Sequence, residues 1–143
     1  MDAKTVARHV KRNYLNALKW EVFADVIPAL TELAELGWKH IILSNHVQEL
    51  AGLVSQLKLA EYFVDVVSSA NVGVEKPHPE AFRRVSRTLP VQSQCWMVGD
   101  NVTADIDGAN SVGIDAILVR KHHSSVKYVS ENLLGVAPVV DAV

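Results

Sequence analysis

Short apolar runs alternate with amphipathic segments along most of this 143-residue chain, and this alternation is the strongest constraint on its fold. Four runs have the composition of buried strands, at residues 38–43, 62–67, 95–98 and 115–119. Strands that alternate with helices pair in parallel through right-handed crossovers, and the helices then cover both faces of the sheet. The sequence therefore predicts a three-layer, Rossmann-like α/β domain.

The segments around these strands show helical periodicity. Apolar residues recur every three or four places in the ranges 5–22, 26–36, 47–59, 80–89, 103–112 and 126–134. Pro28 suits the first turn of its helix, and Gly37 suits the residue that ends it. We expect a polar loop over residues 68–79 and a last edge strand over residues 136–140.

The bulk composition narrows the class of protein. The chain has the length of one domain, which we divide into an N-terminal helix at residues 1–22 and an α/β core at residues 23–143. A formal charge of −2 gives no broad basic surface, so we expect no nucleic acid partner. No apolar run approaches the roughly 20 residues that span a bilayer, and the first residues lack a secretory apolar region. We therefore expect a cytoplasmic protein without a membrane partner.

Polar side chains gather where the predicted strands end. Ser44 and Asn45 follow the strand at 38–43, and Asp100 follows the strand at 95–98, with Asp105 five residues later. Lys76 lies in the loop that leads to the helix at 80–89. Because open α/β folds bind ligands at the carboxyl ends of their strands, these groups should meet at one edge. A hydroxyl, an ammonium and two carboxylates suit a phosphoryl group beside Mg²⁺.

Each group also has a plainer explanation when taken alone. Ser44 could cap the following helix, Lys76 could be a solvated loop lysine, and Asp100 could be a capping residue with a solvated Asp105 beside it. His46 is more simply explained by hydrogen bonds to the backbone than by contact with a substrate. The combination of the groups, rather than any one of them, carries the prediction.

Taken together, residues 41–45, 74–82 and 98–109 resemble motifs II, III and IV of the haloacid dehalogenase superfamily, in its phosphatase-like branch. The resemblance extends over about residues 23–140. It implies a Mg²⁺-dependent phosphohydrolase that acts on a small phosphorylated metabolite. Ser44 and Lys76 would be the catalytic side chains, and both would bind the phosphoryl group together with Asn45. Asp100 and Asp105 would be the metal site, Asp105 supporting the ion through water or indirect contacts.

Motif I of that family has no match in this sequence. The family places it at the end of a central strand, where an Asp-x-Asp supplies the nucleophile. The sequence has one Asp-x-Asp, at residues 105–107, where a two-residue step on a helix turns the side chains to different faces. We therefore expect a core that lacks the first central strand, and we interpret residues 1–22 as the remnant of the family's cap. Loss of that strand would expose two hydrogen-bonding edges.

Two functions fit these features. The first is a phosphohydrolase in shortened form, which would not catalyse hydrolysis by itself because the nucleophile is missing. The alternative is a non-catalytic phosphate-binding or protein-interaction domain that forms homo-oligomers through its exposed sheet edges. A phosphorylation-receiver domain fits less well because Lys76 precedes Asp100, and a dinucleotide-binding domain would need a Gly-x-Gly-x-x-Gly that is absent.

Overall fold

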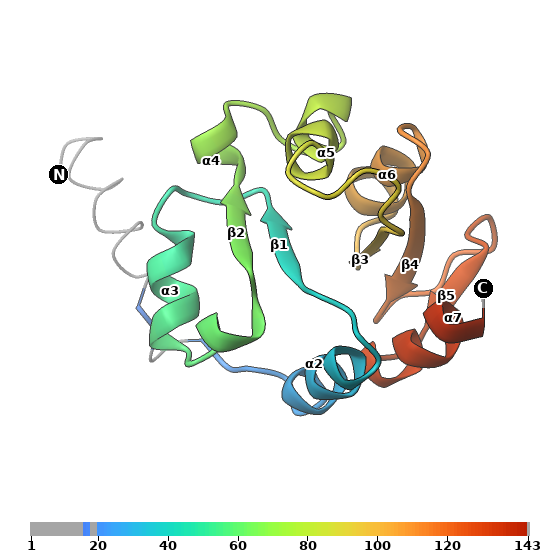
Figure 1. The fold of residues 1–143 in the computed structure, drawn as a ribbon, viewed down its shortest axis with the longest axis horizontal. Helices are drawn as coiled ribbons and strands as arrows, with labels where there is room; N and C mark the ends of the chain where they lie inside the picture. Colours follow the sequence, from blue (N-terminus) through green and yellow to red (C-terminus); the bar gives the residue numbers. More distant parts are fainter. Residues whose placement is uncertain (1–15, 18–19, 143) are drawn as a thin grey trace, which may run out of the picture.

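The strands form two separate parallel sheets (Figure 1). The computed structural model describes residues 16–17 and 20–142. The first sheet pairs β1 (Ile41–Ser44) with β2 (Asp65–Ser68). The second has the order β3 (Trp96–Gly99), β4 (Asp115–Val119) and β5 (Tyr128–Ser130). Among the described residues, β1 pairs with β2 alone and β3 with β4 alone, so each keeps one unpaired edge.

Helices surround both sheets in the α/β arrangement that the sequence predicts (Figure 1). They are α2 (Val26–Glu35), α3 (Leu50–Gln56), α4 (Ser69–Val72), α5 (Pro79–Ser86), α6 (Gly108–Asn110) and α7 (Val136–Ala142). Two 3-10 turns, η2 (Ala60–Tyr62) and η4 (Leu133–Gly135), and a π-helical turn, η3 (Val102–Asp107), complete the described elements. Every helix in the described ranges is too short or too polar to traverse a lipid bilayer.

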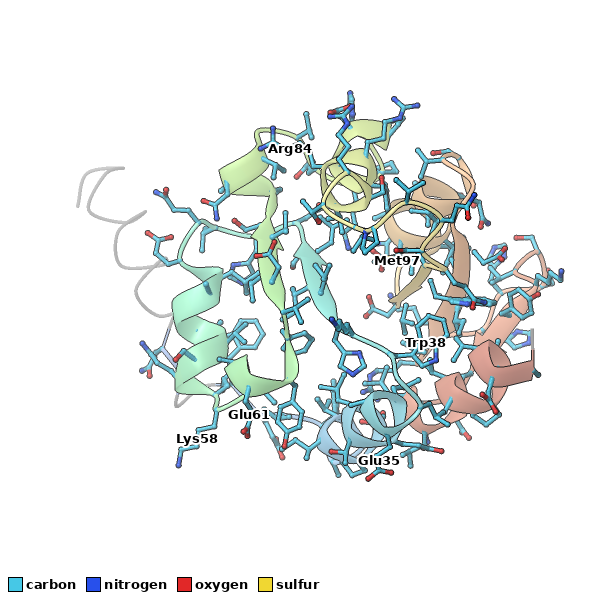
Figure 2. All side chains as sticks on the ribbon, in the orientation of Figure 1. Glu35, Trp38, Lys58, Glu61, Arg84 and Met97 are labelled. Carbon is cyan, nitrogen blue, oxygen red and sulfur yellow. The ribbon has the colours of Figure 1, made fainter. Side chains whose placement is uncertain are left out.

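Two apolar clusters connect the sheets through the helices. The first is built from α5, α6, η3 and β4, and both Leu43 of β1 and Met97 of β3 pack against it. The second is built from β4 and α7, and Trp38 and Trp96 pack against it. Figure 2 shows Trp38 and Met97 in the region between the two sheets. Full burial of a large apolar side chain contributes about 1.5–3 kcal/mol, and each of these four partly buried side chains contributes less. These contacts jointly hold the two halves together without strand pairing between them in the described part of the chain.

Most predicted elements are present at nearly the predicted positions. The strand at 115–119 has the predicted bounds, and α2 begins at Val26 as predicted. Gly37, which follows the C-terminal cap residue Leu36, adopts a φ of +94°, a conformation that favours glycine. The helix predicted over residues 103–112 begins as a π-helical turn. The helix predicted over residues 5–22 falls largely outside the described residues.

Three predictions near the ends of the chain or between motifs were wrong. The helix predicted over 126–134 is instead β5 followed by η4, because Tyr128, Val129 and Ser130 pair with β4. The edge strand predicted over 136–140 is part of α7, whose buried residues Val136, Ala137 and Val140 follow helical spacing. The polar loop predicted over 68–79 contains the short helix α4. Strand pairing and burial, rather than local propensity, determine the secondary structure of these segments.

An ion pair joins the start of α2 to the end of β4. The Arg120 guanidinium donates to the two carboxylate oxygens of Asp25 at 2.8 and 3.0 Å, and the Leu133 N–H donates to the same carboxylate at 2.7 Å. Arg120 also lies 4.0 Å from the centroid of the Phe23 ring. The hydrogen bond from Arg120 holds the pKa of Asp25 below its usual value. The pair thus fixes α2 to the second sheet, although α2 leads directly into β1.

We predict that Asp25→Asn lowers the free energy of unfolding at pH 7 by about 1–3 kcal/mol, because a charge-assisted hydrogen bond is lost. Since the folded-state pKa of Asp25 is lowered, its contribution is present above the unfolded pKa of about 3.9 and is lost as the pH falls through the folded value. The free energy of unfolding, measured with urea, should therefore decrease less between pH 7 and pH 3 for Asp25→Asn than for the unchanged chain. Glu35→Gln, at the exposed far end of the same helix (Figure 2), should shift stability by less than about 0.5 kcal/mol. Equal acid sensitivity of Asp25→Asn and the unchanged chain would contradict the assignment.

Candidate active site

The predicted site residues Ser44, Asn45, Lys76, Asp100 and Asp105 are called the polar edge here, and the first two lie at the end of β1. Ser44 is the last residue of this strand and lies opposite Ser68 of β2. Helix α3 starts only at Leu50, with Glu49 as its N-terminal cap residue. Ser44 and Asn45 therefore do not cap that helix, and the plainer explanation of this pair is wrong.

The side chain of Asn45 holds the loop that carries Lys76. Its amide nitrogen donates to the Lys76 carbonyl at 3.0 Å, and its amide oxygen accepts from the Lys76 N–H at 2.8 Å. Both backbone groups of Lys76 are thus fixed to the residue directly after β1. The sequence predicts Asn45 at the phosphate site, but it does not reveal this contact because the two residues are 31 positions apart.

Lys76 and Asp105 form a buried ion pair. The Lys76 ammonium donates to one Asp105 carboxylate oxygen at 2.5 Å, and the two side chains retain only 10% and 6% of their accessible surface. The Asn101 N–H donates to the other carboxylate oxygen at 3.1 Å. A solvated loop lysine is therefore excluded for Lys76. The pair connects the loop beside β1 to the turn after β3.

The backbone around Asp105 is shaped for this contact. Asp105 lies in η3, where the main-chain N–H groups of Asp105 and Ile106 both donate to the Asn101 carbonyl, at 2.9 and 3.3 Å. Asn101 caps the turn by accepting from the Ala104 N–H at 2.8 Å. Asp105 is buried whereas Asp107 is exposed, which confirms that the two-residue step separates the carboxylates. π-helical turns of this kind often mark functional sites.

Glycine at position 99 leaves room for the Asp105 carboxylate. A Cβ atom placed on Gly99 would lie 2.1 Å from an Asp105 carboxylate oxygen, far inside contact distance. Gly108 has a similar role that sequence reasoning missed, because a Cβ atom there would lie 2.6 Å from the Phe82 ring and 3.1 Å from the Pro77 backbone. A glycine inside a helical pattern is the sequence signal for such close packing.

Asp100 stands apart from the buried pair. It comes directly after Gly99 at the end of β3 and is exposed. Both oxygens of Asp105 already accept hydrogen bonds, so the two carboxylates are not an equivalent pair. No group of three His, Cys, Asp or Glu side chains in the described part of the chain is placed to hold a metal ion. Oxygen donors of this kind suit Mg²⁺, which binds few protein carboxylates and keeps several waters.

His46 contributes to the packing of the same edge. Its main-chain N–H donates to the Ser69 hydroxyl at 3.0 Å, and that hydroxyl donates to the His46 carbonyl at 3.2 Å. The imidazole ring lies 6.3 Å from the Trp20 ring. These contacts tie the loop after β1 to the start of α4.

A model of haloacid dehalogenase-like hydrolases matches residues 2–113, which include all of the motifs described above. The chain belongs to the haloacid dehalogenase-like hydrolases. The match confirms the resemblance that residues 41–45, 74–82 and 98–109 indicate. It includes β1, β2 and β3 and leaves β4, β5 and α7 outside.

Curated relatives and solved structures point to the phosphatase-like branch. The chain is 35% identical over 102 residues to a glyceraldehyde 3-phosphate phosphatase of Methanopyrus kandleri, covering 69% of this chain and 43% of that protein. It is 29% identical over 115 residues to human haloacid dehalogenase-like hydrolase domain-containing protein 3, covering 80% and 46%. The crystal structure of a phosphatase of the family from Thermococcus onnurineus superposes with a TM-score of 0.77 at 26% identity, covering 84% of this chain and 58% of that one. The chain thus spans about half the length of its curated relatives.

We predict that Gly99→Ala destabilises the fold by about 2–4 kcal/mol, because the new methyl group would displace the Asp105 carboxylate from its buried position. Gly52→Ala is the matched control: a Cβ atom there meets no atom within 4 Å, and alanine should stabilise α3 by about 0.5–1 kcal/mol. Urea unfolding measures both variants. If the loss caused by Gly99→Ala is the same in an Asp105→Gly background, which removes the Asp105 Cβ atom as well as the carboxylate, the clash does not involve the Asp105 side chain.

We also predict that Lys76→Met costs about 3–5 kcal/mol, because it leaves the Asp105 charge buried without its cation. The double variant Lys76→Met with Asp105→Asn should recover part of this loss, since no uncompensated charge remains. Lys58→Met, at an exposed lysine (Figure 2), is the control and should have little effect. A Lys76→Met loss as small as that of the control would mean that the pair is not formed in solution.

Proposed function

We propose that this chain carries the phosphoryl-binding edge of a Mg²⁺-dependent phosphomonoester phosphohydrolase whose substrate is a small phosphorylated metabolite. The buried Lys76–Asp105 pair is the main support, because it fixes the ammonium of a residue whose backbone is bonded to Asn45, directly after Ser44. Relatives named as phosphatases of a small sugar phosphate are a second support.

Three residues would hold the phosphoryl group. The Ser44 hydroxyl and the main-chain N–H of Asn45 would donate to its oxygens. The Lys76 ammonium has three donors, of which Asp105 uses one, so it can also donate to a phosphoryl oxygen and balance its charge. The side chain of Asn45 acts on the backbone of Lys76 and keeps the loop in place.

Asp100 would be the direct ligand of Mg²⁺. Its carboxylate is exposed at the strand end, whereas Asp105 is engaged by Lys76 and by the Asn101 N–H and would support the ion indirectly. When bound, Mg²⁺ would neutralise charge on the phosphoryl oxygens. With one carboxylate in direct contact, the affinity of these residues for the ion alone should be weak.

We further propose that these 143 residues do not hydrolyse a phosphomonoester by themselves. The one Asp-x-Asp of the sequence, at residues 105–107, lies in the helical turn η3 and not at the end of a strand. Its first carboxylate, Asp105, is already paired with Lys76. In this proposal, residues 1–22 belong to the cap and residues 23–143 to the core.

Binding of inorganic phosphate, followed by ³¹P NMR with and without Mg²⁺, tests the proposal. We expect Ser44→Ala to weaken binding about 10-fold, as the loss of one hydrogen bond to a charged group implies. Asp100→Asn should remove the enhancement of phosphate binding by Mg²⁺. Thr88→Ala removes an exposed hydroxyl outside the candidate site, so it is the matched control for Ser44→Ala and should leave phosphate binding unchanged.

Hydrolysis of p-nitrophenyl phosphate with Mg²⁺ provides the second measurement. We expect negligible release of phosphate by the chain alone. Phosphate binding that is insensitive to both Ser44→Ala and Asp100→Asn would exclude the site. Robust hydrolysis that Asp100→Asn abolishes would instead show that the chain contains a nucleophile.

A further inference from the structure

A buried hydroxyl without a hydrogen-bond partner lies beside the candidate site. Ser68 is the last residue of β2 and retains 1% of its accessible surface. Its side-chain oxygen has no hydrogen-bond partner among the described residues. Buried polar side chains in folded proteins nearly always have a partner, and one without a partner loses its contacts with water and gains nothing in return. The Ser68 hydroxyl therefore needs an explanation that packing alone does not give.

The usual local partner of such a hydroxyl is already engaged. Ser68 directly precedes the short helix α4, where a serine side chain commonly accepts a hydrogen bond from a main-chain N–H of the first turn, but it makes no such bond. The Ala70 N–H of that turn donates instead to the His46 carbonyl at 3.2 Å. The neighbouring Ser69 hydroxyl also bonds to the His46 main chain, at 3.0 and 3.2 Å. Ser68 therefore does not cap α4, and its hydroxyl is available to another group.

Strand pairing places Ser68 beside Ser44 of the candidate site. β1 and β2 lie side by side (Figure 1), and their parallel register pairs Ser44 with Ser68. Side chains of paired residues in a parallel sheet point to the same face. Neighbouring strands are about 4.8 Å apart, so two paired serine side chains are within reach of each other. The buried hydroxyl is thus next to the hydroxyl that we place at the phosphoryl group.

Rotation about one side-chain bond of each serine is enough to join the two hydroxyls. The structure has no hydrogen bond between them. Each oxygen is one bond from its Cβ atom and turns among three staggered positions. With the strands about 4.8 Å apart, these rotations can bring the oxygens to the roughly 2.7–2.8 Å of a bond between hydroxyls. A phosphoryl oxygen that accepts the Ser44 hydrogen would select this arrangement, because the lone pairs of the Ser44 oxygen then remain to accept from Ser68.

We propose that Ser68 is a positioning residue for phosphate binding: its hydroxyl donates to the Ser44 oxygen, and the Ser44 hydroxyl donates to a phosphoryl oxygen. This inference rests on the proposed function of Ser44 and adds to it a residue that does not touch the ligand. Two contributions to affinity follow. The Ser68 hydroxyl gains the partner that it lacks in the structure, and Ser44 becomes a stronger donor because hydrogen bonds in a chain polarise one another.

One substitution should have opposite effects on stability and on binding. Ser68→Ala removes a buried polar atom without a partner, so it should raise the urea concentration at the midpoint of unfolding. The same substitution should weaken the binding of inorganic phosphate with Mg²⁺, followed by ³¹P NMR, at least about 3-fold. Ser93→Ala is the matched control. The Ser93 hydroxyl already donates to the Pro90 carbonyl at 2.6 Å, so alanine there should not raise the midpoint and should leave phosphate binding unchanged.

A double-mutant cycle tests whether Ser68 acts through Ser44. A Ser44→Ala background lacks the oxygen that accepts from Ser68, so Ser68→Ala should change phosphate binding there by less than about 1.5-fold. Ser68→Thr keeps the hydroxyl but adds a methyl group at a buried position. It should lower stability and yet bind phosphate more tightly than Ser68→Ala does. A purely structural effect on the strand would give the reverse order, because threonine disturbs the packing more than alanine does.

The outcomes separate this inference from the proposed function. Phosphate binding that Ser44→Ala weakens and Ser68→Ala does not would overturn the role of Ser68 alone. Binding that is insensitive to both substitutions would overturn the proposed site as well. Equal weakening by Ser68→Ala with and without the Ser44 hydroxyl would show that Ser68 does not act through Ser44. A lowered unfolding midpoint for Ser68→Ala would show that the buried hydroxyl already has a partner, which also contradicts the inference.

Discussion

The buried ion pair between Lys76 and Asp105 is the contact on which the polar edge depends. Through Asn45 it connects to the end of β1, and through the Asn101 N–H it connects to the turn after β3. Two charges with this little exposure are stable only while they stay together. The absence of a side chain at Gly99 is therefore a condition for the whole arrangement, because it lets the carboxylate reach this position.

The sequence predicts five residues for this edge, and the structure connects three of them, Asn45, Lys76 and Asp105, in a way that the sequence does not show. The strand at 115–119 and the start of α2 were predicted correctly because their signals are local: an apolar run, a proline in the first turn and a closing glycine. The bridge from Asn45 to Lys76 joins residues 31 positions apart, so no local pattern contains it. The C-terminal region was misread for the same reason, since β5 exists only by pairing with β4.

The unpaired edges of β1 and β3 among the described residues could also be predicted from the sequence. Nothing upstream of Ser44 resembles an apolar strand with two acids at its end, and in the described part of the structure β1 and β3 remain unpaired on one side. The sequence did not show how the two halves stay together. Helices do this, through Leu43 and Met97 on one apolar cluster, Trp38 and Trp96 on the other, and the Asp25–Arg120 pair.

The apolar clusters and the polar edge share the same two strands. Leu43 and Met97 pack against one cluster, and each lies within two residues of a strand end that carries the candidate site, Ser44 or Gly99. The spacing of those strand ends is therefore set by apolar packing as well as by the Lys76–Asp105 pair. A change that loosens this packing should also disturb the polar edge, because two charges with so little exposure depend on a fixed distance between them. The candidate site thus depends on the core contacts behind it as much as on its own polar side chains.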